Sequence, residues 1–178
     1  MFNAPVIKLC AALAGNTTLV ELAASGKKLS AAALEAVAAM LRRNTALRRL
    51  SLGDAALGTA GVATLAGGLE TNTGVQSIDF SFKTLDAAAG ECLEKLLASN
   101  LALTELLLSR NELGDEAAAA MMRGHAANPG SKLVKLDLGQ TGLSGAICNG
   151  LGPLMQTLQT LILSSNALGA EGGEATVA

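Results

Sequence analysis

The stretch LTELLLSRNELGDE, residues 103–116, decides the fold. Leu106 and Leu108 stand two positions apart, as expected for buried residues of a short β-strand. Counted from Leu103 as position zero, they occupy positions three and five, and Leu113 occupies position ten. Position eleven is Gly114 here and Ser, Gly or Asp in other copies, residues suited to the start of a helix. The stretch therefore predicts a strand followed by a helix.

The same pattern recurs along the chain, at first with a spacing of 28 residues, and opens at Leu19, Leu47, Val75, Leu103, Leu133 and Leu158. A second apolar set follows each strand at positions fifteen, eighteen and twenty-two, the spacing of one helix face. This period predicts an α/β repeat solenoid, a right-handed superhelix of βα units. We expect parallel strands on its concave face and helices on its convex face.

Two repeats depart from the regular spacing. The step from Leu103 to Leu133 is 30 residues, and the extra residues fall near Asn128-Pro129-Gly130, a loop signal. The step from Leu133 to Leu158 is 25 residues, so we expect a shortened fifth helix near residues 150–153. Pro153 would end or kink that helix.

One repeat domain accounts for residues 1–178. Counting back 28 positions from the second helix places Val6, Leu9 and Leu13 on the core side, so residues 1–16 fit the helix half of a repeat. After the sixth strand no complete helix follows, and an uncapped strand edge favours pairing with another chain. A fragment of a longer array, self-association through this C-terminal strand and a frayed natural end all remain open.

Asparagines recur at two repeat positions. Position twenty-five holds Asn44, Asn72, Asn100 and Asn128, which we interpret as helix stops in a left-handed conformation. Position eight holds Asn111 and Asn166, expected to satisfy backbone groups in the turn after the strand. The other repeats lack an asparagine there, so the turns after strands one, two, three and five should be held less well.

Composition argues against several function classes. The formal charge of −2 gives no reason to expect nucleic acid or an acidic membrane as a partner, and no apolar run reaches membrane-spanning length. The three cysteines lack metal-ligand spacing and indicate buried thiols in a reducing, cytoplasmic setting. His125, the only histidine, is expected near the surface at a helix end. Nothing supports an enzyme or a cofactor.

The predicted binding surface is the concave strand face. Strand positions two and four point away from the core, and positions six and seven lie at the strand exits, so burial does not explain their charged members. Leu107 and Ile162 should be exposed, and Phe82 is the only aromatic residue left outside the core; apolar and arginine residues often anchor protein interfaces. A solvated strand face is the alternative. The predicted protein-binding residues are Glu21, Arg49, Asp79, Phe82, Glu105, Leu107, Arg110, Lys135, Asp137 and Ile162.

Residues 44–52 (NTALRRLSL) and 103–116 resemble leucine-rich repeats of the ribonuclease-inhibitor-like subfamily. The openings of the repeats are also similar to those of tropomodulin and NOD-like receptors. The resemblance implies an intracellular protein-interaction module, a scaffold or adaptor. The alternatives it leaves are a regulator of the small GTPase Ran or of a cytoskeletal filament, and a structural repeat that stacks end to end.

Overall fold

The computed structural model describes residues 3–152 and 154–169. It contains one six-stranded sheet in which every strand pairs in parallel with the strand that follows it in the sequence. The strands are β1 (Glu21–Ser25), β2 (Arg49–Gly53), β3 (Ser77–Asp79), β4 (Glu105–Leu107), β5 (Lys135–Asp137) and β6 (Thr160–Ile162). The repeat openers at positions 19, 47, 75, 103, 133 and 158 therefore stand side by side in one sheet, as the period predicts.

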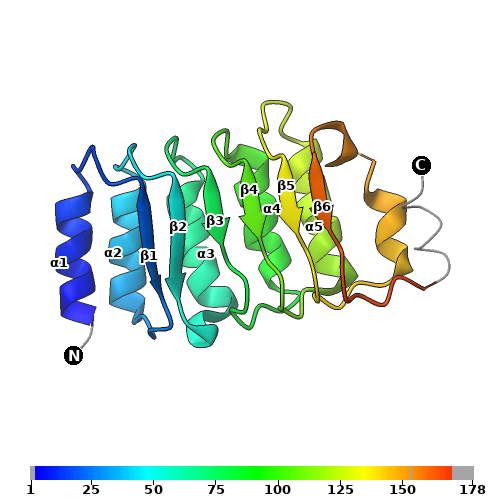
Figure 1. Ribbon diagram of the computed structural model, residues 1–178, viewed down its shortest axis with the longest axis horizontal. Coiled ribbons are helices and arrows are strands. Elements are labelled where there is room, and N and C mark those ends of the chain that lie inside the picture. Colours follow the sequence, from blue (N-terminus) through cyan, green and yellow to red (C-terminus); the bar gives the residue numbers. More distant parts are fainter. Residues whose placement is uncertain (1–2, 153, 170–178) are drawn as a thin grey trace.

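Helices alternate with the strands and cover one face of the sheet (Figure 1). They are α1 (Asn3–Leu13), α2 (Ala31–Leu41), α3 (Gly58–Leu69), α4 (Ala89–Ser99) and α5 (Gly114–Ala126). Three short 3-10 helices complete the described elements: η1 (Ala55–Leu57), η2 (Gly145–Gly150) and η3 (Leu154–Gln156). The solenoid with one strand and one helix per repeat is confirmed.

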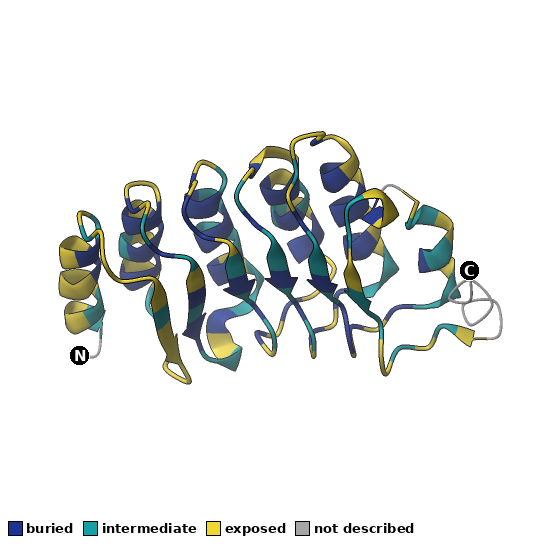
Figure 2. Cartoon of the chain, turned by 45° about the horizontal axis from the view of Figure 1, so that its top comes forward, coloured by how far each residue is buried: buried dark blue, intermediate teal, exposed yellow. Residues whose placement is uncertain are grey.

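The core lies between the helices and the sheet, where buried residues gather in Figure 2. The position-three residues share one register: Leu50 pairs with Ile78, Ile78 with Leu106, and Leu106 with Leu136. All four are at most 3% exposed. In the outermost strands the equivalent Leu22 and Leu161 are only half-buried, because each has a strand on one side only.

The position-twenty-five asparagines form a buried ladder rather than left-handed helix stops, so that prediction was wrong. Asn100 has a φ of −76°, and none of the four has a positive φ. Its Nδ2 donates to the carbonyl oxygens of Leu69 (2.7 Å) and Asn72 (3.2 Å) in the preceding repeat. Its Oδ1 accepts from the backbone N–H groups of Ala102 and Leu103. The same donation to two carbonyls of the preceding repeat is made by Asn44, Asn72 and Asn128.

The position-eight asparagines hold the turn of the repeat before their own. Asn111 Oδ1 accepts from the backbone N–H groups of Lys83 (3.0 Å) and Leu85 (3.1 Å), in the turn after β3. Asn166 Oδ1 binds the turn after β5 in the same way, through the N–H groups of Thr141 and Leu143. The expectation of weakly held turns after strands three and five was therefore wrong, since the next repeat supplies the missing asparagine.

The fifth repeat is irregular, as its length predicts, but it contains two 3-10 helices instead of a shortened α-helix. The missing residues shift the inward face by one position, so Leu154 is fully buried while Met155 is 61% exposed. The expectation for Pro153 lies outside the described residues.

Two further expectations about core positions were wrong. His125 is not near the surface: it is 4% exposed, and its Nε2 hydrogen-bonds Thr157 Oγ1 at 2.9 Å. Leu9 in α1 is 43% exposed, whereas its neighbour Cys10 is buried. Leu9 occupies the repeat position of Val37, which packs toward a sheet in α2; α1 has no preceding strand to cover that side.

Candidate functional site

The sheet surface opposite the helices carries the predicted binding residues. We call this surface the strand face and define it by two rows that run across the strands in register. The first row is Glu21, Arg49, Ser77, Glu105, Lys135 and Thr160, and the second is Ala23, Ser51, Asp79, Leu107, Asp137 and Ile162. Figure 1 shows no helix in front of these strands. Buried parallel sheets normally have both faces covered, so an open face of this kind is available to a partner.

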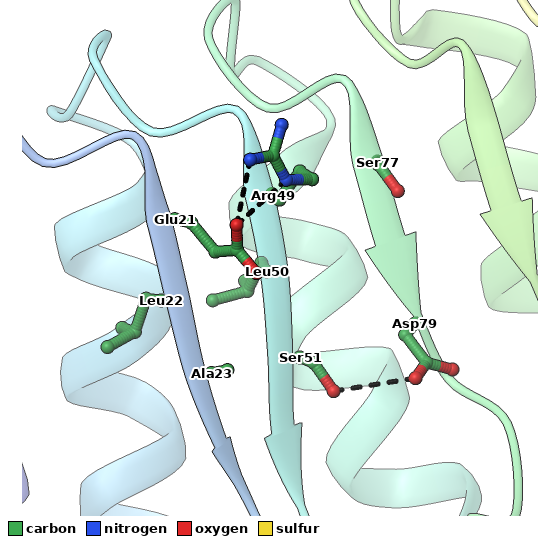
Figure 3. A pocket seen from close by; sticks show the side chains of 8 residues that line it. All are labelled: Glu21, Leu22, Ala23, Arg49, Leu50, Ser51, Ser77 and Asp79. Atoms are coloured by element: carbon green, nitrogen blue, oxygen red, sulfur yellow. Dashed lines mark hydrogen bonds and ion pairs between the residues drawn. The ribbon is translucent and has the colours of Figure 1, made fainter.

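The first half of the strand face contains a shallow hollow of about 150 Å³ over β1, β2 and β3 (Figure 3). Arg49 crosses to β1, where its Nη2 lies 2.8 Å and its Nε 2.9 Å from Glu21 Oε2. Both side chains are more than half exposed, at 58% and 52%. An ion pair with this exposure contributes little to stability, at most about 1 kcal/mol. Arg49 and Glu21 can therefore exchange each other for a partner's charges at low cost.

Two aspartates of the second row also have structural work at the end of their strands. Asp79 Oδ1 accepts from the backbone N–H of Ser81 at 2.8 Å, and Asp137 Oδ1 accepts from that of Gly139 at 2.9 Å. Such bonds to the residue two positions on stabilise a turn. Ser51 Oγ approaches Asp79 Oδ2 at 3.5 Å from the neighbouring strand. Part of the reason for these two carboxylates is therefore the fold itself.

The second half of the strand face is less apolar than expected. Leu107 and Ile162 are half-buried rather than exposed, because neighbouring side chains of the same row flank them. Glu105 Oε2 accepts from Ser77 Oγ at 3.1 Å, and within residues 3–152 and 154–169 Lys135 forms no ion pair. Charged groups without charged partners surround a partly accessible leucine here.

Phe82 and Arg110 lie beyond the strands, in the turns that follow β3 and β4. Together with Gln140 and Ser165, the residues at the same repeat position, they form what we call the turn rim. All four have positive φ angles, between 55° and 59°. A second hollow, of about 710 Å³, is lined by Phe82, Arg110, Asn111, Glu112, Gln140, Gly142 and Ser165. The ten predicted residues thus separate into a strand set and a turn set.

The sequence analysis missed Glu112, Gly142 and Ser165 as members of this second hollow. Its opener count gives their positions, seven and nine, but the apolar pattern says nothing about how far a turn projects. Because no glycine marks the turn-rim position in these repeats, the left-handed backbone was also not apparent.

Other reactive groups serve the core. Burial raises the pKa values of the Cys10 and Cys92 thiols and lowers that of the His125 imidazole. Cys10 is buried, whereas Cys92 and Cys148 are half-buried against the core. Among the described residues no cluster of three or more His, Cys, Asp or Glu side chains is arranged to hold a metal ion. No helix in the described part of the chain is long and apolar enough to cross a bilayer.

Comparisons of sequence agree with this architecture. The Leucine Rich repeat family matches residues 99–122 and 155–175. A NACHT, LRR and PYD domains-containing protein 3 from Macaca mulatta is 36% identical over 91 residues, which make up 49% of this chain and 9% of that protein. The ribonuclease inhibitor of Mus musculus is 40% identical over 77 residues, 42% of this chain and 17% of the inhibitor. The chain thus spans less than a fifth of the length of these two relatives.

Solved structures share the fold at low sequence identity. The C-terminal domain of tropomodulin from Caenorhabditis elegans has a TM-score of 0.60 and 14% identity, with 80% of this chain and 90% of that chain covered. A structure titled leiomodin-1 actin-binding site 2 has a TM-score of 0.62 and 14% identity, with 75% and 77% covered. Both are similar in the arrangement of strands and helices.

Proposed function

We propose that this chain, a leucine-rich repeat protein of the ribonuclease-inhibitor-like type, binds a protein partner through its strand face and acts as a scaffold or adaptor. Leucine-rich repeat domains generally mediate protein–protein interaction and are typically non-enzymatic. The observation that supports this proposal most is the parallel sheet whose helices lie on one face only (Figure 1). The open face presents the side chains of six adjacent strands in register.

The chemistry of the strand face suits a protein better than a small molecule. Its first hollow is shallow and holds about 150 Å³, below the roughly 300 Å³ at which small-molecule pockets begin. Six strands spaced about 4.8 Å apart extend the face over roughly 24 Å, a length that fits a folded partner or a long segment of one. Arginine and partly exposed leucine are residue types that contribute much of the binding energy in protein interfaces.

A capture experiment with matched variants tests the proposal. The strand-face variant carries Arg49→Ala, Leu107→Ala and Arg110→Ala, and the control carries Arg42→Ala, Arg43→Ala and Leu9→Ala. Both remove two exposed arginines and one leucine, but the control residues lie off the strand face. We expect proteins captured from native extract by the wild type to be retained by the control and lost from the strand-face variant, at unchanged helical content. Equal retention by both variants contradicts the proposal.

The alternative is a regulator of a filament or of a small GTPase. One structural neighbour is titled as an actin-binding site, so cosedimentation with filamentous actin is the first specific assay. Binding that disappears in the strand-face variant would identify actin as the partner within the same proposal. A Ran-dependent role would instead appear as faster nucleotide hydrolysis when the chain is mixed with that GTPase.

A further inference from the structure

The turn rim keeps bulky side chains at a backbone position that glycine fits better. Phe82, Arg110 and Gln140 have φ angles of 55°, 59° and 55°. In this region the Cβ of an L-residue approaches the following carbonyl oxygen, and a bulky residue there is an outlier. The first repeat has Gly26 at the same position, with a φ of 78°. The turn therefore does not need a side chain at this position in order to form.

The side chains retained at this cost are also poorly satisfied by the protein itself. Phe82 is 63% exposed, the largest exposure among the large apolar residues of the described chain. Arg110 is exposed, and within the described ranges its guanidinium has no ion-pair partner. Phe82 N–H donates to the carbonyl oxygen of Ser109, next to Arg110, so the two turns are in direct contact. An aromatic ring and a free guanidinium therefore stand one repeat apart on the second hollow.

We infer that the turn rim anchors the partner, and that the partner presents a carboxylate beside a large apolar side chain; this inference rests on the proposed function of the strand face. The Arg110 guanidinium can bind a carboxylate through two parallel hydrogen bonds. Phe82 offers a ring to an apolar neighbour on the same partner segment. The carboxylate of Glu112 lines the same hollow and repels an acidic group, which directs that group to Arg110.

Strain at a binding residue has a consequence that a purely structural role does not share. Replacing Phe82 or Arg110 with glycine relieves the left-handed conformation while it removes the contact. These substitutions should therefore leave the thermal midpoint unchanged or raise it, and should weaken binding. A structural residue would lose stability on the same change. Thr84→Gly is the matched control, since Thr84 has a φ of 51° but does not line the hollow.

The test uses the full chain and two synthetic peptide pools, measured by fluorescence polarisation. One pool carries Asp or Glu two residues before Leu or Phe, and the other has Lys in place of the acid. We expect the acidic pool to bind at least about tenfold more tightly than the basic pool, and Phe82→Gly or Arg110→Gly to weaken that binding about tenfold or more, equivalent to 1.4 kcal/mol at 25 °C. The Thr84→Gly chain should bind like the wild type.

Three results overturn the inference: equal or tighter binding of the basic pool, no binding of either pool, or full binding by both glycine variants. The double variant Arg49→Ala/Leu107→Ala separates this inference from the proposed function. If it alone loses the protein captured from extract, the strand face binds and the turn rim does not anchor. If the glycine variants alone lose that protein, the turn rim anchors and the strand face does not bind.

Discussion

Removal of one rung of the asparagine ladder should destabilise the whole solenoid. Asn100 is 4% exposed and makes four hydrogen bonds, two to carbonyl oxygens of the preceding repeat and two from backbone N–H groups that lead into β4. Asn100→Ala leaves these four backbone groups without a side-chain partner. At a net value of about 1 kcal/mol per bond the loss is about 4 kcal/mol. Ala102 is half-buried, and water can reach its N–H, so we expect about 3–4 kcal/mol.

The assay is urea unfolding followed by far-UV circular dichroism, with hydrogen exchange at single amides. For a chain of this size the expected loss lowers the thermal midpoint by roughly 6–16 °C. The backbone amides of Ala102 and Leu103 should lose protection first, since they donate to Asn100. Asn149→Ala is the control: Asn149 is exposed, and its replacement should cost no more than about 0.5 kcal/mol. A loss below about 1 kcal/mol for Asn100→Ala, or unchanged exchange at both amides, would refute the reasoning.

Two further predictions concern the packing of α5. Burial lowers the pKa of His125 below its ordinary value of 6.5, so its contribution to stability is complete above about pH 6.5 and is lost as the pH falls toward the lowered pKa. His125→Gln should therefore lose less stability than the wild type between pH 7 and pH 5 in parallel urea titrations, and an equal loss in both chains would contradict this. Gly124→Ala should cost about 1–3 kcal/mol, because a Cβ there would overlap the backbone of Glu94 in α4. Gly67→Ala has open space around it inside α3 and should stabilise by up to about 1 kcal/mol, so thermal midpoints that move in the same direction would argue against this packing.

The strand-and-helix period was readable from the sequence because the same apolar positions recur in every repeat. The asparagine ladder was not, although its residues were noticed. An asparagine at the end of a helix fits both a left-handed stop and a side chain that reaches sideways, and the local sequence is the same in both cases. What distinguishes them is a hydrogen bond to a residue 28 or 31 positions earlier, as between Asn100 and Asn72 or Leu69.

The misplaced core residues have local physical causes. The 25-residue fifth repeat loses part of its helix, so the inward face moves from Met155 to Leu154. His125 keeps the inward direction of the leucines it replaces, and Thr157 from the following segment supplies a hydrogen-bond partner. A two-residue insertion after α5 does not change the direction of a side chain within that helix.

The candidate site was predicted in its strand set more completely than in its turn set. Alternation along a strand identifies outward positions such as Arg49 and Glu105, and both lie on the strand face. Alternation does not show how much a neighbouring strand covers, which is why Leu107 was expected to be exposed. The projection of Phe82 and Arg110 depends on the turn backbone, which the apolar pattern does not encode.

Site-specific photo-crosslinking tests the central claim, that a protein binds the open face of the sheet, most directly. A benzophenone side chain is introduced at Ser51 or Leu107 on the strand face, and at the exposed Ala119 on α5 as the helix-side control. After irradiation in native extract, we expect the two strand-face positions to give an adduct of the same mass and position 119 to give none. An adduct formed from position 119 alone, with none from positions 51 and 107, would contradict the account.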